Sequence, residues 1–127
     1  MKTNDITGII IDCAMKVHTE LGPGLLESVY KECLFYELQQ NGMFVEKEKV
    51  LLVIYHDVRL DVGFRIDLLV ENEIVVELKA VEALHDVHLA QILTYLKLTD
   101  NRIGLLINFN VARLKNGIKR VANNYID

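Results

Sequence analysis

Hydrophobic side chains recur along the chain with two spacings, and these separate predicted helices from predicted strands. Residues 6–21 carry apolar side chains every three or four positions, the spacing of one buried helix face. Asn4 or Asp5 is expected to cap this helix, and the Gly-Pro-Gly tripeptide that follows ends it. A second helix is expected from about residue 25 to residue 40, closing at Asn41-Gly42.

The middle of the chain is rich in residues that favour strands. Residues 44–49 alternate in character and predict an entry strand, and residues 50–55 form a continuous apolar run typical of a strand covered on both faces. Residues 59–70 predict a longer strand. Its hairpin partner starts at Ile74 and ends near Val81. These segments predict a sheet that is already three strands wide.

The last third of the chain adds a helix and a strand. Residues 84–98 have helical spacing, and residues 103–109 are apolar enough for a central strand. A helix between two strands of one sheet usually makes a right-handed crossover. Residues 113–120 predict a short, solvated C-terminal helix or loop. The order is therefore α-α-β-β-β-α-β and a short C-terminal helix, which predicts an α/β fold with a central mixed four-stranded sheet flanked by helices.

The bulk composition favours one folded domain. With 127 residues, 51% of them hydrophobic and 25% charged, the chain is long enough for one buried core and short for two, so we expect a single domain over residues 1–127. It has no apolar N-terminal stretch of the signal type, and no run of about eighteen apolar residues. We therefore expect a cytoplasmic protein that does not enter a membrane.

Three charged side chains, Asp67, Glu77 and Lys79, occur within the otherwise largely apolar hairpin. If its loop comprises residues 71–73, Asp67 lies opposite Glu77 on one face of the hairpin, and Lys79 shares that face. A two-residue turn would shift the register and send Asp67 to the opposite face. The longer loop is favoured because Asn-Gly or Asp-Gly, the usual two-residue turn signal, is missing.

Two carboxylates and a lysine on one largely apolar face are costly to bury without partners or a cation. Carboxylates supply the hard oxygen ligands that Mg²⁺ or Mn²⁺ prefers, and a lysine can orient an attacking water or offset charge on a phosphate. Two other interpretations stay open. The residues are ordinary surface charges of an edge hairpin, or they form a structural ion cluster in which the lysine contributes to stability without a metal.

Four sequence segments together resemble a known family. Glu77-Leu78-Lys79, following a strand that carries Asp67, resembles the PD-(D/E)XK nuclease-like superfamily, and residues 24–30 (GLLESVY) resemble the signature of its GxxExxY branch. Residues 90–97 (AQILTYLK) and 104–109 (GLLINF) are similar to the following helix and the last core strand of that branch. The resemblance extends from about residue 6 to residue 120.

The resemblance implies a restriction-endonuclease-like core and a divalent-metal site. The residues that it assigns are Asp67 and Glu77 as metal ligands with the carbonyl of Leu78, Lys79 beside the attacking water, Glu27 as a further acidic group, and Gln91 at the edge of the site. Glu27 has a second interpretation that is equally strong, because an acidic side chain in the first turn of a helix also complements the helix dipole.

The implied function is metal-dependent hydrolysis of phosphodiester bonds in DNA or RNA. The alternative is a catalytically inactive module of the same fold that binds nucleic acid or a protein partner. The net charge of −4 is unusual for a nucleic-acid-binding protein, although residues 113–120 carry four basic side chains and no acidic one. We expect nucleic acid as a partner, together with a second copy of the chain or an unidentified protein.

Overall fold

Five strands form one mixed sheet in the computed structural model, which describes residues 1–124 apart from the side chains of Asp61 and Val62. The strand order is β1-β2-β3-β4-β5, with β3 and β4 parallel and the other neighbours antiparallel. The strands are β1 (Val45–Tyr55), β2 (Val58–Val70), β3 (Ile74–Lys79), β4 (Ile103–Asn108) and β5 (Ile118–Ala122), and the helices are α1 (Thr3–Leu21), α2 (Glu27–Gln40), α3 (Asp86–Thr99) and the 3₁₀ turn η1 (Leu114–Gly117).

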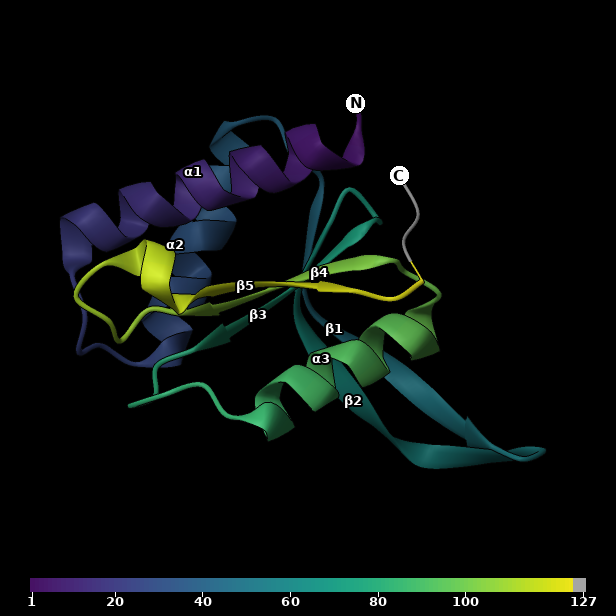
Figure 1. Cartoon of the computed structure of the whole chain (residues 1–127). Coiled ribbons are helices and arrows are strands. Elements are labelled where there is room, and N and C mark those ends of the chain that lie inside the picture. The colour runs from purple at the N-terminus through teal and green to yellow at the C-terminus, as the bar shows by residue number, and fades with distance from the viewer. Residues whose placement is uncertain (125–127) are drawn as a thin grey trace.

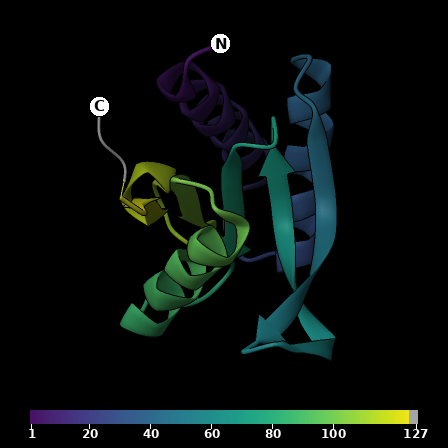
Figure 2. The ribbon, with the colours of Figure 1, turned by 90° about the vertical axis from the view of Figure 1, so that its right-hand side faces the viewer.

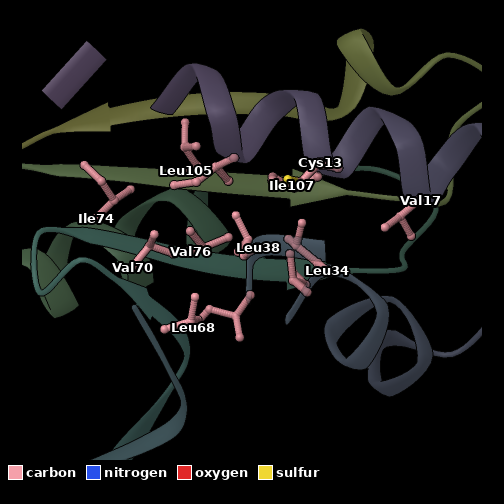
Figure 3. Close-up of a cluster of buried hydrophobic side chains, with 14 of the residues drawn as sticks. Cys13, Val17, Leu34, Leu38, Leu68, Val70, Ile74, Val76, Leu105 and Ile107 are labelled. Carbon is pink, nitrogen blue, oxygen red and sulfur yellow. The ribbon is translucent and has the colours of Figure 1, made fainter. Parts of the chain in front are cut away.

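Helices cover both faces of this sheet (Figure 1). The larger core lies between the sheet and α1 with α2, where side chains such as Leu34, Leu68 and Val76 point toward one another (Figure 3). The smaller core lies on the other face, where Ile92 and Leu96 of α3 pack against the sheet. Alternate residues of β3 therefore enter different cores, which explains why this strand reads as a continuous apolar run.

The predicted hairpin register is confirmed. Val70 pairs with Ile74, so the loop comprises residues 71–73. Glu71 and Asn72 both adopt a left-handed conformation, with φ of 54°. The Glu71 carboxylate accepts the backbone N–H of Phe44 at 2.9 Å, which holds a non-glycine residue in this conformation.

Two predictions about β1 and the first helix are wrong. Residues 50–55, expected to be covered on both faces, belong to β1, which lies at the edge of the sheet and is exposed at alternate positions. Beyond the body of the sheet it forms a long hairpin with β2 (Figures 1 and 2), and Leu52 and Ile54 are exposed there. The first helix begins earlier than predicted, after Lys2, so Asn4 and Asp5 lie inside it.

The sheet has five strands where four were predicted. The chain after β4 does not form the predicted C-terminal helix but a single 3₁₀ turn, η1, and then β5, which pairs with β4. The unpaired edge of β4 explains this outcome, because backbone groups on an apolar strand need partners. None of the helices within the described residues has the length and apolar character to cross a membrane.

Tyr30 connects the start of α2 to the ends of β3 and β4. Its ring is fully buried and stacks on Phe109 with ring centroids 4.5 Å apart. Its hydroxyl donates to the carbonyl of Gly22 at 2.6 Å and accepts the N–H of Leu25 at 3.1 Å. The N–H of Phe109 in turn donates to the carbonyl of Lys79 at 2.9 Å. These contacts fix the first turn of α2 relative to the last residue of β3.

Removing the hydroxyl in Tyr30→Phe is expected to lower the free energy of unfolding by about 1–2 kcal/mol, because the half-buried carbonyl of Gly22 loses its donor while ring packing is kept. Tyr36→Phe is the matched control, since Tyr36 lies on the same helix and is 58% exposed. Urea denaturation of both variants measures the difference. Equal stability of the two variants would contradict the anchoring role of Tyr30.

Candidate metal and hydrolase site

The site begins where the β2–β3 ladder ends. Leu68 and Val76 are the last paired residues, and beyond them side chains replace the backbone contacts. The N–H of Asp67 donates to the Glu77 carboxylate at 2.8 Å, and the N–H of Leu78 donates to the Asp67 carboxylate at 2.9 Å. The structure therefore brings together the two carboxylates that the sequence placed opposite each other, and each is fixed by the backbone of the other strand.

Alternation along β3 places the site on the face covered by α3. Val75 packs into the core under α3 and Val76 into the core under α1 and α2, so Glu77 and Lys79 share the face of Val75. Tyr95 of α3 lies close enough to Glu77 and Asp67 for their charges to affect its phenol. Burial raises the pKa of its phenol first, and the charges of Glu77 and Asp67 raise it further.

Glu77 has the most perturbed environment in the site. Its side chain is only 5% exposed. Burial, followed by the negative charge of Asp67, raises the pKa of Glu77 to about 8, although the N–H of Asp67 and the charge of Lys79 act in the opposite direction. At neutral pH Glu77 therefore holds a proton.

Lys79 and Gln91 lie at the borders of this pair. The half-buried Lys79 ends β3, two residues beyond Glu77 on the same face. Gln91, in α3, is exposed and hydrogen-bonds the Tyr95 hydroxyl, an interaction that lowers the pKa of Tyr95. Gln91 thus lies one helical turn from Tyr95, whose pKa is raised by the charges of both carboxylates.

Glu27 stands apart from the pair. It is exposed in the first turn of α2, and no hydrogen bond or ion pair joins it to another residue that the structure describes. Helix α2 begins at the end of the sheet where β3 ends (Figures 1 and 2), and Tyr30, one turn further on, holds it there. Both interpretations of Glu27, a site residue and a partner of the helix dipole, are compatible with this place.

The donor set fits a hard divalent cation. Two carboxylates from adjacent strands supply oxygen ligands, and a cation between them would offset the burial and the repulsion by Asp67 that raise the pKa of Glu77. Within the described residues no group of three or more His, Cys, Asp and Glu side chains gathers to hold a metal ion. A cation here would therefore take its remaining ligands from backbone oxygen, water or substrate.

One neighbour of the site was not foreseen from the sequence. Across the sheet, Glu77 pairs with Leu106, and Leu106 pairs with Lys119 of β5. Paired residues point to the same face, so Lys119 lies in the same row as Glu77. The sequence pattern concealed this because residues 113–120 were assigned to a helix or loop. The alternation of polar and apolar residues in β5 is too short to signal a strand.

The comparison with protein families agrees with this arrangement. A family model described as the PD-(D/E)XK nuclease superfamily matches residues 4–121, which include every strand of the sheet except the last residue of β5. No curated protein and no solved structure matches the chain.

The raised pKa of Glu77 predicts a pH-dependent stability in metal-free buffer. The folded protein holds this proton up to about pH 8, whereas an unfolded glutamate loses it near its ordinary pKa of 4.5. The free energy of unfolding therefore falls as pH rises through this window, with a slope of up to about 1.4 kcal/mol per pH unit. Glu77→Gln removes this slope.

Urea denaturation at pH 5, 6, 7 and 8 in EDTA tests this expectation, with Glu20→Gln as the control for removing an exposed carboxylate. We expect the difference in stability between Glu77→Gln and wild type to grow steadily with pH. A difference that is the same at every pH would show that Glu77 is ionised throughout.

Proposed function

Because the chain belongs to the PD-(D/E)XK nuclease superfamily, we propose that it is a metal-dependent nuclease that hydrolyses phosphodiester bonds of DNA or RNA. One observation carries the proposal, namely the pair of buried Glu77 and half-buried Asp67 at the point where two strands separate. In a merely structural ion cluster each carboxylate would be expected to pair with a cation, whereas within the described residues no ion pair joins Asp67 or Glu77.

We also assign the chain to the GxxExxY branch. The support comes from Gly24, Glu27 and Tyr30, which match that signature. The structure offers a physical reason for the aromatic residue, since Tyr30 holds the turn that precedes α2 and stacks on the residue after β4. The glutamate one turn earlier is thereby kept at the end of β3.

Nucleases of this superfamily typically use divalent metal ions. In this chain Asp67 and Glu77 would hold Mg²⁺ or Mn²⁺, with the carbonyl of Leu78 as a further ligand. When bound, such an ion supplies positive charge that activates water and stabilises charge on the phosphate. The N–H groups that bind the two carboxylates leave them oriented before any ion arrives, which lowers the cost of assembling the site.

The chain's own groups have separate tasks in this proposal. Lys79 donates a hydrogen bond to the attacking water and offsets charge on the scissile phosphate. Glu27 contributes an outer carboxylate from the start of α2. Gln91 positions the Tyr95 hydroxyl and faces the edge of the site, where it can donate to a phosphate oxygen.

The alternative is an inactive nuclease-fold module that binds nucleic acid or a protein partner. One observation favours it, since the described residues gather only two carboxylates at the site and no third acidic or histidine ligand. The two functions differ in a single outcome, which is whether the wild-type protein cleaves nucleic acid when Mg²⁺ or Mn²⁺ is supplied.

Cleavage is expected to depend on each of the three residues of the hairpin. Asp67→Asn, Glu77→Gln and Lys79→Met should each reduce the rate of cleavage at least about 100-fold, because each removes charge from the reacting centre while the amide variants still accept the backbone N–H bonds. The measurement follows the cleavage of labelled single-stranded and duplex DNA and RNA in about 5 mM Mg²⁺ or Mn²⁺.

Asp12→Asn is the matched control, as Asp12 is an exposed carboxylate on α1, which covers the other face of the sheet. It should retain the wild-type rate. Metal-dependent cleavage that survives in the three site variants would place the reacting centre elsewhere, and wild-type protein without any cleavage would favour the inactive module.

Metal binding is expected to release a proton. Calorimetric titration of Mn²⁺ at pH 7 should show roughly one proton released per ion, because the ion displaces the proton that Glu77 holds. The number is obtained by repeating the titration in buffers with different ionisation enthalpies. Saturating Mn²⁺ should also raise the melting temperature of wild type but not of Glu77→Gln. Binding without proton release would contradict the protonated state of Glu77.

A further inference from the structure

The segment after β4 presents basic side chains in a pattern that separates three of them from the fourth. Arg113, Lys115 and Lys119 are exposed, and no ion pair joins them to another residue that the structure describes. Arg120 points to the other face of β5, where its guanidinium donates to Asn4 at 3.0 Å. Residues 113–120 therefore do not form one basic surface, because β5 turns Lys119 and Arg120 to opposite faces of the sheet.

Arg113 and Lys115 border a hollow of about 540 Å³ between the end of α1 and η1. Its wall is fixed by His18, whose Nε2 hydrogen-bonds the carbonyl of Val111 at 2.8 Å. Thr19 adds a hydroxyl to the lining, and no acidic side chain takes part in it. Two cations and a hydroxyl around an open hollow without a carboxylate suit an anionic group.

Lys119 borders a second hollow of about 300 Å³, on the side of the sheet that carries the candidate site. Asn108 and Asn116 supply amide groups to this hollow, and Glu82 supplies its one acidic side chain. Lys119 lies two strands from Glu77 in the same row, so their Cα atoms are separated by about 10 Å, as twice the usual spacing of neighbouring strands requires.

The two hollows adjoin along one segment of chain. Val111 lines the second hollow, and the residues that follow it directly line the first. The segment starts at Phe109, whose N–H binds the carbonyl of Lys79. The three cations therefore lie on the segment that follows the end of the candidate site, with Lys119 at the hollow on the site's face and Arg113 and Lys115 at the hollow beside α1.

We propose that Arg113, Lys115 and Lys119 bind successive phosphates of the nucleic-acid backbone as it leaves the candidate site. This inference rests on the proposed nuclease function and names how its substrate is held. A polyanion with regularly spaced charges matches cations spread along one segment, whereas a single small anion would engage only one hollow. Local placement also explains how a chain with a net charge of −4 can bind nucleic acid.

The experiment measures binding without cleavage. Fluorescence anisotropy in EDTA follows the wild-type protein, the triple variant Arg113→Gln/Lys115→Gln/Lys119→Gln, and the single variants, against labelled 20-nucleotide DNA and RNA of fixed sequence. The triple variant should bind at least about 10-fold more weakly at 100 mM salt, and the slope of log K against log salt should fall by about 2 to 3 in magnitude. Arg120→Gln, which removes one charge from a side chain that hydrogen-bonds Asn4 and lines neither hollow, should bind within about twofold of wild type and should be compared with each single variant.

The variants should melt at nearly the wild-type temperature, because substitutions at exposed positions change stability little, and thermal melting checks that they are folded. Unchanged affinity and salt slope in the triple variant would overturn the inference, as would a loss in Arg120→Gln equal to that in the single variants. Wild-type protein that does not bind nucleic acid in EDTA at low salt would also overturn it. Binding that depends on Arg113, Lys115 and Lys119, by a protein that never cleaves nucleic acid, would refute the nuclease function and leave this inference standing.

Discussion

The reciprocal hydrogen bonds between β2 and β3 are the constraint on which the candidate site depends. Asp67 and Glu77 each accept a backbone N–H from the opposite strand, so the strands separate without leaving donors unpaired. The arrangement places two carboxylates side by side in a largely buried position, and burial together with mutual repulsion raises the pKa of Glu77. The same contacts therefore pair the backbone N–H groups of both strands and leave two adjacent carboxylates that a bound cation would stabilise.

The rest of the fold keeps this point in place from several directions. The turn at Glu71 and Asn72 sets the register of the hairpin. Phe109 binds the end of β3 and stacks on Tyr30, which orients the first turn of α2. Helix α3 covers the site face and brings Tyr95 within reach of both charges. Elements distant in sequence thus converge on the end of β3, where the ladder to β4 also ends.

Much of the site's local geometry could be predicted from the sequence because it depends on short-range rules. A three-residue loop fixes the opposition of Asp67 and Glu77 by counting alone, and the superfamily is recognisable from the residues around them. The edge position of β1 and the existence of β5 were missed because an apolar run does not reveal how many neighbours a strand has. The place of Lys119 beside the site followed from β5 and was missed with it. The raised pKa of Glu77 depends on burial and so needed the three-dimensional structure.

The central claim is that Asp67 and Glu77 bind one divalent cation directly. The most direct measurement is an anomalous difference map from crystals of the protein grown or soaked with Mn²⁺. The account predicts one strong peak between the two carboxylates, in contact with an oxygen of each. A map with no peak there at saturating Mn²⁺, or with peaks only at other carboxylates, would contradict it.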